Sequence, residues 1–463
     1  KAQRQIHHEI CRKNFAHPLF NWWDSMDPMG VETFCHSAIS FKNPQQHDTV
    51  LRASTEAKYA YIVISGQLKY TQDRTTSRVI ECSEEQLTAG TWICEVALWT
   101  HWTAVGTLDA DEPSELYAIS SEKVAEVVSQ SMVCARVFQE YGAAFHARVL
   151  AAAPPDAAWP SDIHVPFCTF EEILPSLSLP VREVIGITAL QHSRARPQER
   201  QQVKQQVHEG KCVVILSQSG EVQRIAVVSV LKLARPDCRF LVHLGTVNSH
   251  SGKVKASCEL PGSKSREGET PINTIDRLLN GPLHAFANAL VVEENECRSE
   301  RSKAKKFGMT TLYVRTVHTA VLDPEKVRPL VASITMRTSS KATSDFPSRD
   351  NWDMFVMAQS EDKVAPDTGS ESQDLLAGFK FRLCGWLTEE EFDMYRSDRG
   401  QKTLQIAIDD IRITPHTLRA AARSLPTSRH GSFETLRNAR SAGSDVGDIG
   451  GDTLGAEPHS LDV

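Results

Sequence analysis

Hydrophobic and polar positions change their spacing several times along the chain, and each change marks a different kind of element. Between residues 50 and 118, short apolar or alternating runs are separated by turn residues, a pattern that predicts an antiparallel β-roll. The expected strands are 59–71, 77–82, 91–99, 106–110 and 115–120.

Helical spacing of apolar residues is found on both sides of this β-rich stretch. Residues 1–45 are predicted to be largely helical, with the first helix ending at His17 and Pro18. Valines and aromatic residues recur at helical spacing over 121–152. The segment 151–160 is rich in proline and alanine and predicts the main domain boundary.

A second β-rich region follows this boundary. A glutamine-rich helix is expected at 198–209, closed by Gly210. Two polar stretches, 339–351 and 360–374, predict surface loops, and one short helix is expected after Pro415. The strands expected in this region are 212–218, 222–233, 239–247, 286–294, 310–322 and 379–387.

The last residues of the chain are too polar to offset the entropy of ordering, because acids but no Lys or Arg follow Gly443. The pattern as a whole predicts an α+β protein in four parts. These parts are a basic linker helix (1–16), a helix-flanked β-roll (17–152), a β-rich domain (165–415) and a disordered tail (416–463).

Composition narrows the class of protein. With 463 residues, 41% hydrophobic and 24% charged, the chain is typical of globular proteins, and it has no run of 18 apolar residues. Its net charge of −7 excludes a global attraction to nucleic acid. Eleven cysteines without a CxxC pair indicate neither a zinc site nor a disulfide framework, and predict a reducing compartment.

One stretch of the β-roll resembles the ligand cassette of the cyclic-nucleotide-binding domain family. A glycine, Gly66, ends the preceding strand, and the cassette Cys94–Leu98 is followed without a gap by Gly106–Ala110. The resemblance implies a jelly roll over about residues 30–150. It also implies a ligand site formed by Gly66, Cys94, Glu95, Ala97, Leu98, Ala104 and Thr107.

The cassette departs from the family where the phosphate should bind. The family's arginine stands nine residues after the glutamate, a position held here by Ala104, and Cys94 replaces a glycine. No Lys or Arg lies between Arg78 and Lys123. We therefore expect cAMP and cGMP to bind weakly or not at all. The cassette is then a scaffold whose pocket is empty or filled by the protein's own side chain; the alternative is a cassette that still binds a ligand.

Two segments, 17–26 (HPLFNWWDSM) and 95–102 (EVALWTHW), resemble the cytoplasmic portions of voltage-gated-type potassium channels of protists. The resemblance implies a channel transmembrane region upstream as partner, a place at the cytoplasmic face of a membrane, and a possible homo-oligomer. Lys1, Arg4 and Arg12 would suit the linker. We expect several upstream hydrophobic segments of about 20 residues, one of them rich in spaced arginines. The alternative is a soluble cyclic-nucleotide effector.

Residues 255–283 resemble the loop and helix of Nudix hydrolases. Gly268 and Glu269 are followed, eight residues after Glu269, by Arg277, and Thr270 and Pro271 suit a helix start. The glutamates that hold metal in that family are replaced by Leu278, Asn280 and Gly281. We expect an inactive Nudix-like α/β/α domain with no catalytic or metal-binding residues. The alternatives are a Nudix-type phosphohydrolase or an unrelated β-rich domain.

These observations predict a regulatory chain that is not an enzyme and carries no resident cofactor.

Overall fold

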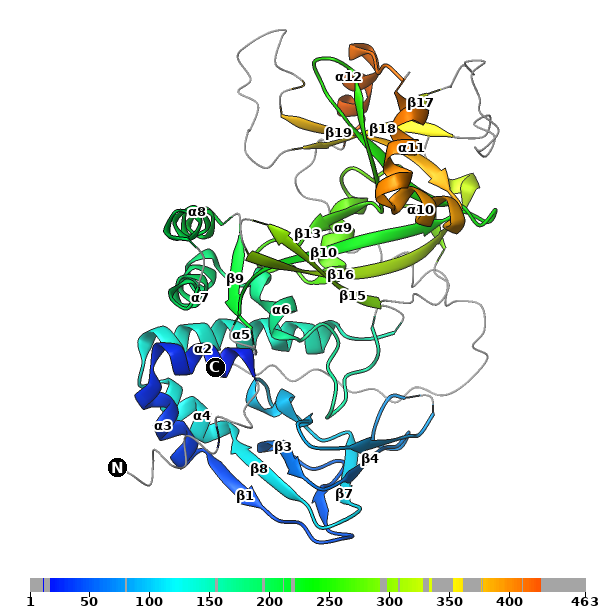
Figure 1. Cartoon of the computed structure of the whole chain (residues 1–463). Helices are drawn as coiled ribbons and strands as arrows, with labels where there is room; N and C mark the ends of the chain where they lie inside the picture. The colour runs from blue at the N-terminus through cyan, green and yellow to red at the C-terminus, as the bar shows by residue number, and fades with distance from the viewer. Residues whose placement is uncertain are drawn as a thin grey trace, which may run out of the picture. The chain divides into compact units, whose positions relative to one another are not determined.

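The computed structural model divides into two compact units (Figure 1). Unit 1 comprises Lys1–Lys232, Leu260–Ile275 and Glu294–Thr319; unit 2 comprises Leu233–Glu259, Asp276–Glu293 and Ala320–Val463. The chain therefore does not divide at 151–160, where we predicted the main boundary. The structure describes residues 11, 17–79, 81–154, 157–193, 196–210, 212–217, 221–291, 298–306, 309–327, 333–334, 353–360, 376, 378–409 and 411–425. The predicted linker helix (apart from Cys11), the loop 339–351, nearly all of 360–374 and the tail from residue 426 lie outside these residues.

Two short helices precede the β-roll in unit 1. Helix α2 (Pro18–Met26) begins at the position where we predicted a helix end. Proline is well suited to a first helical position because its missing N–H would be unpaired there anyway. The His17 side chain caps the helix by accepting the N–H of Leu19. Helix α3 (Pro28–Ser37) repeats the arrangement, with Asp27 as its N-cap.

The β-roll consists of two four-stranded antiparallel sheets, ordered β1-β8-β3-β6 and β2-β7-β4-β5. Gly66 turns the chain between β3 and β4 at φ +89°, where a Cβ atom would lie 2.2 Å from Ser114 Oγ. The strands are β1 (Ile39–Lys42), β2 (Thr49–Leu51), β3 (Tyr59–Ser65), β4 (Leu68–Gln72), β5 (Ser83–Leu87), β6 (Trp92–Ile93), β7 (Gly106–Ala110) and β8 (Glu115–Ser120).

Three expected strands of the roll differ from the prediction. The expected strand 59–71 forms two strands, β3 and β4, joined by the turn at Gly66. The expected strand 77–82 is replaced by β5, a polar edge strand whose first four residues are all exposed. Hydrophobic patterning could not find it, because main-chain pairing with β4 holds it in place. The expected strand 91–99 ends after Ile93, where left-handed Cys94 turns the chain into the 3-10 helix η1 (Glu95–Leu98).

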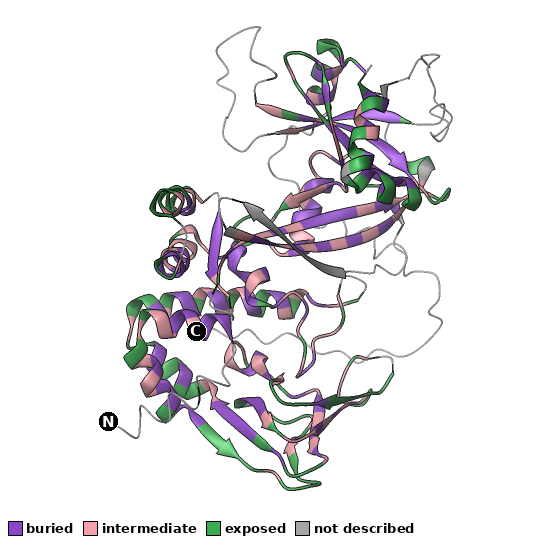
Figure 2. Cartoon of the chain, in the orientation of Figure 1, coloured by how far each residue is buried: buried purple, intermediate pink, exposed green. Residues whose placement is uncertain are grey.

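Helices α4 (Ser121–Val128) and α5 (Met132–Ala151) follow the roll, so the predicted helical stretch 121–152 forms two helices. The buried face of α5 contributes Phe138, Tyr141 and Phe145 to an aromatic cluster with residues of α2 and the cassette. Figure 2 colours parts of both helices as buried. This cluster fixes the helices against the cassette.

The chain after α5 belongs to the same unit as the roll. Ile173, Leu174 and Ile185 share one hydrophobic core with the roll, as do Ile215 and Ile225. The elements of this part are α6 (Phe170–Ile173), η2 (Leu174–Ser176), α7 (Leu179–Gln191), α8 (Pro197–His208), β9 (Val213–Leu216), β10 (Val222–Ala234), β13 (Gly262–Lys264), β15 (Arg298–Lys306) and β16 (Met309–Leu322).

Unit 2 is built on antiparallel pairs of β11 with β12 and β19, and of β18 with β19. Within the expected strand 286–294, the first residues form tight turns, β14 covers Leu290–Val291, and 292–294 lie outside the described residues. No helix among the described residues has the length and apolarity needed to cross a bilayer. The other elements are β11 (Phe240–Val247), β12 (Val254–Glu259), α9 (Pro271–Leu279, which starts in unit 1), η3 (Pro324–Lys326), β17 (Ser333–Ile334), β18 (Met354–Ser360), β19 (Phe379–Leu387), α10 (Glu389–Arg396), α11 (Asp398–Ile408) and α12 (Pro415–Arg423).

Candidate functional site

The predicted cassette lies at the turn from β6 into η1. Cys94 adopts φ +57°, a left-handed conformation in which the family's glycine is free of strain. Glu95, whose side chain is 26% exposed, accepts hydrogen bonds from His17 Nε2 (3.2 Å) and Trp99 Nε1 (3.1 Å). Ala97 is buried in the core, and Leu98 packs against it.

Ala104 is 1% exposed, and its main-chain groups bond to Ser54 and Thr55. The N–H groups of the next two residues, Val105 and Gly106, take no part in these main-chain bonds to Ser54 and Thr55. Thr107 accepts the N–H of Ala53 through its hydroxyl. The cassette therefore retains main-chain donors that suit an anion, without the family's arginine.

The carboxylate of Asp162 accepts these donors. Gly106 N lies 2.8 Å from Asp162 Oδ2, and Val105 N lies 3.1 Å from the same oxygen. Trp102 Nε1 donates to Oδ1 at 2.6 Å, and Tyr70 donates its hydroxyl to Oδ2 at 2.8 Å. A carboxylate of the protein itself thus accepts the main-chain N–H groups that directly follow Ala104, the position of the family's arginine.

Asp162 is delivered by residues 157–169, which we call the strap. The main chain contributes as well, because the N–H of Cys94 donates to the Asp162 carbonyl. Ser161 closes a turn with His164 that aims the aspartate at the roll. Buried Arg148 of α5 fixes the α6–η2 segment that follows the strap, by donating to the carbonyl of Glu172 (3.2 Å) and the hydroxyl of Ser176 (3.1 Å).

Small residues make room for this arrangement. A Cβ atom on Gly106 would lie 2.4 Å from the ring of Tyr70, so glycine lets that ring approach the strand. The approach places the Tyr70 hydroxyl on Asp162. Burial raises the pKa values of Tyr70 and Cys94, and the neighbouring Asp162 adds to the effect. Both groups therefore stay protonated at neutral pH, and both donate to Asp162.

The charge of Asp162 is held by neutral donors. The residue is 2% exposed, and its described hydrogen bonds come from N–H, O–H and S–H groups. Burial raises the pKa of Asp162, while the bonds from Trp102, Tyr70 and the main chain act in the opposite direction. Five donors aimed at two oxygens suit a carboxylate, because only the Tyr70 oxygen and the Cys94 sulfur could accept the proton of the acid form.

Sequence reasoning missed Asp162, Tyr70 and Trp102. A weak signal was present, because Asp162 stands in an otherwise largely apolar stretch, 157–170. The prediction placed a domain boundary at 151–160, just before Asp162, and gave Asp162 itself no role.

The Nudix-like segment forms its helix as predicted, from Pro271 to Leu279, with Ile275 and Leu279 buried. Glu269 has a local role, since its Oε2 accepts the N–H of Arg266 (2.9 Å) and the hydroxyl of Thr274 (3.2 Å). Gly268, at φ +75°, shapes the same turn. Among the described residues, no group of three His, Cys, Asp or Glu side chains could hold a metal ion.

Comparison with known proteins identifies the β-roll. Residues 42–131 match the family model described as Cyclic nucleotide-binding domain. This region of the chain is thus similar in sequence to cyclic nucleotide-binding domains, and its two antiparallel sheets with flanking helices fit that fold. The match ends at residue 131, before the β-rich domain that was predicted over 165–415. No curated protein matches the chain.

Three solved structures illustrate the similarity. A cyclic nucleotide-binding-like protein from Brucella abortus is 17% identical over 23% of this chain and 89% of its own, with a TM-score of 0.20. The sensor domain of the transcriptional regulator DNR from Pseudomonas aeruginosa is 18% identical over 29% and 85%, with a TM-score of 0.23. The C-linker/CNBHD of zELK channels is 17% identical over 22% and 55%, with a TM-score of 0.19.

Proposed function

We propose that the cyclic nucleotide-binding domain of this chain is a self-liganded regulatory domain, with Asp162 in the place of the cyclic phosphate. The observation that carries this proposal is the set of bonds from Val105, Gly106, Trp102 and Tyr70 to the Asp162 carboxylate. A nucleotide would have to displace the strap and would still meet no arginine at Ala104. The domain therefore responds to whether the strap is in place or displaced, and does not respond to the concentration of cyclic nucleotide.

Isothermal titration calorimetry of the whole chain tests this function. We expect cAMP and cGMP to bind more weakly than about 100 μM, because losing one charge-assisted pair costs about 1.5–3 kcal/mol, or roughly 10–150-fold in affinity. Displacing Asp162 weakens binding further. Low-micromolar affinity for either nucleotide would overturn the proposal and favour the effector alternative.

We further propose that this domain serves a potassium channel as part of its cytoplasmic regulatory region. The support is the pair of channel-like segments at 17–26 and 95–102, which the structure brings together: His17 bonds to Glu95, and Trp99 packs on the aromatic cluster. The test is the complete coding sequence. Hydrophobic segments of about 20 residues upstream, one of them with regularly spaced arginines, are expected; a wholly polar upstream region would contradict the channel context.

The remaining part of the chain is proposed to be non-catalytic. Glu269 is engaged in its own turn, and Leu278, Asn280 and Gly281 offer no carboxylates for a metal. We expect no hydrolysis of nucleoside diphosphate derivatives by the whole chain with Mg²⁺ or Mn²⁺, measured as phosphate release. Metal-dependent turnover that is lost in Glu269→Gln would contradict this expectation.

A further inference from the structure

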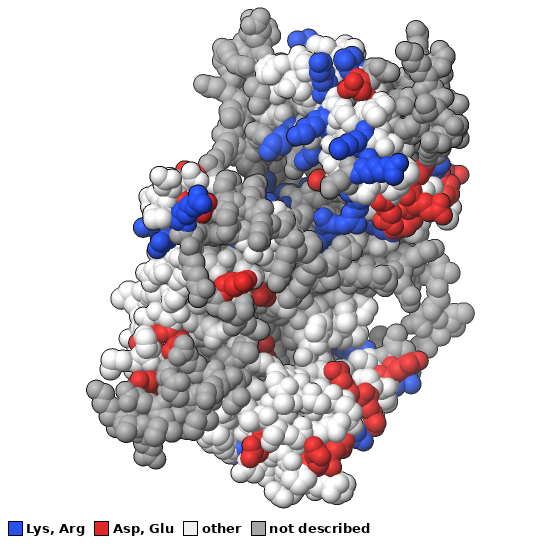
Figure 3. Space-filling model, viewed as in Figure 1, with Lys and Arg blue, Asp and Glu red and all other residues white. Residues whose placement is uncertain are grey.

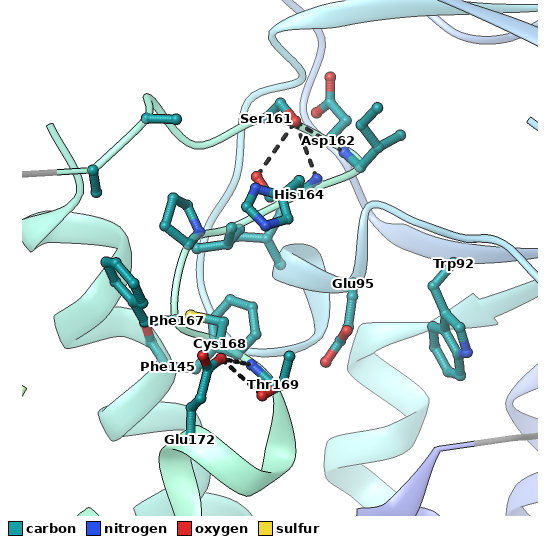
Figure 4. A pocket seen from close by; sticks show the side chains of 16 residues that line it. Trp92, Glu95, Phe145, Ser161, Asp162, His164, Phe167, Cys168, Thr169 and Glu172 are labelled. Atoms are coloured by element: carbon teal, nitrogen blue, oxygen red, sulfur yellow. Dashed lines mark hydrogen bonds between the residues drawn. The ribbon is translucent and has the colours of Figure 1, made fainter. Parts of the chain in front are cut away.

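A cavity of about 690 Å³ lies between the cassette and the strap, all within unit 1. Its size is typical of small-molecule sites. The strap supplies most of its lining, so the cavity exists because the strap lies against the roll. Side chains that matter for recognition are the aromatic rings of Trp92 and Phe167 and the carboxylate of Glu95 (Figure 4).

Glu95 presents an uncompensated negative charge to this cavity. Both of its described hydrogen bonds end on Oε1 and come from His17 and Trp99. His17 Nδ1 accepts the N–H of Leu19, so its proton is on Nε2 and the ring is neutral. Two neutral donors hold one oxygen of Glu95 and leave its charge in place. Figure 4 shows the carboxylate directed toward the side of the cavity lined by Phe167 and Thr169.

The other charges around the cavity do not cancel that of Glu95. The Asp162 carboxylate points away from Glu95 into the roll, and the buried guanidinium of Arg148 lies close to Glu172. Of the described lining side chains, only His164 can become positive, and none is Lys or Arg. Acidic side chains also outnumber basic ones over the roll on the face drawn in Figure 3.

We propose that this cavity binds a small organic cation whose ammonium group pairs with Glu95 and whose apolar body lies against Phe167 and Trp92. Aromatic faces attract cations and pack against apolar groups, so one ligand would satisfy both features. Because strap and cassette both line the site, the bound ligand would hold Asp162 in the cradle. The proposal rests on the strap position in the proposed function, but cAMP binding and amine binding are separate measurements that can fail separately.

Calorimetry with phenethylamine, an aromatic ring carrying an ammonium group, tests the site in the whole chain. Phenethyl alcohol is the neutral comparison of nearly the same shape. We expect phenethylamine to bind at millimolar concentration or below, and the alcohol at least about 10-fold more weakly, as the loss of one charge-assisted contact implies. Absence of phenethylamine binding, or equal binding of the alcohol, would overturn the proposal.

Two variants locate the binding. Glu95→Gln removes the charge and should weaken phenethylamine binding at least about 10-fold, whereas Glu112→Gln, a change on the exposed β7–β8 turn, should leave it unchanged. Equal effects of the two changes would overturn the assignment. If Glu95→Gln fails to fold, the amine and alcohol comparison on the unaltered chain still decides the question.

Discussion

Replacing Asp162 with alanine is expected to lower the free energy of unfolding of unit 1 by about 2–4 kcal/mol. The change leaves the donors of Trp102, Val105, Gly106 and Tyr70 without their acceptor, and a buried unsatisfied donor costs about 1–3 kcal/mol. Water entering the vacated cradle keeps the total below the sum of the four. Urea denaturation followed by tryptophan fluorescence measures the loss, because Trp102 lies at the site.

Two further variants make this prediction specific. Glu112→Ala deletes an exposed carboxylate and should change stability by no more than about 0.5 kcal/mol. Asp162→Asn should also destabilise unit 1, because the amide places its own N–H groups against donors that need an acceptor. If Asp162→Ala proves as stable as Glu112→Ala, the carboxylate is not held as the structure shows.

The second large effect is a gain of cyclic nucleotide binding. We expect the double variant Ala104→Arg with Asp162→Ala to bind cAMP at least about 10-fold more tightly than the unaltered chain. The first change restores the cation opposite the phosphate, worth about 1.5–3 kcal/mol, and the second vacates the main-chain donors. Calorimetry with cAMP measures the gain.

The single variant Ala104→Arg is the informative control. We expect its guanidinium to pair with the Asp162 carboxylate, which then stays on the main-chain donors, so that this variant does not bind nucleotide. Tight cAMP binding by this single variant would mean that Asp162 leaves the cradle readily. If the double variant fails to bind cAMP, other parts of the strap besides the Asp162 carboxylate block the site.

Much of the β-roll could be predicted from the sequence. Strands β7 and β8 begin and end where the apolar pattern places them, and the cassette aligned without a gap. Such patterns are local, because the polarity of each residue in a strand depends on which face of the sheet it lies on. The same holds for β19, and helix α12 forms in the region where one short helix was expected. Elements defined by main-chain pairing or by backbone strain, such as polar β5 and the turn at Cys94, lack that signal.

The candidate site could be predicted only in part. Ala104 and Cys94 indicated a phosphate site without its cation, because a missing charge is visible in the sequence. The group that replaces the phosphate could not be found in this way, since Asp162 lies 58 residues after Ala104 and reaches it only through tertiary packing. The proline- and alanine-rich segment 151–160 predicted a domain boundary, because its composition is typical of a linker. Its neighbours pack into the core of the roll, and local composition does not record such contacts.

The central claim is that the Asp162 carboxylate fills the phosphate cradle, and hydrogen exchange at the Gly106 amide tests it most directly. We expect this amide, which donates to Asp162 Oδ2 at 2.8 Å, to exchange slowly in the unaltered chain and much faster in Asp162→Ala. The Leu108 amide, within strand β7, should stay protected in both. A Gly106 amide that exchanges quickly in the unaltered chain, or equally slowly in both, would contradict the account.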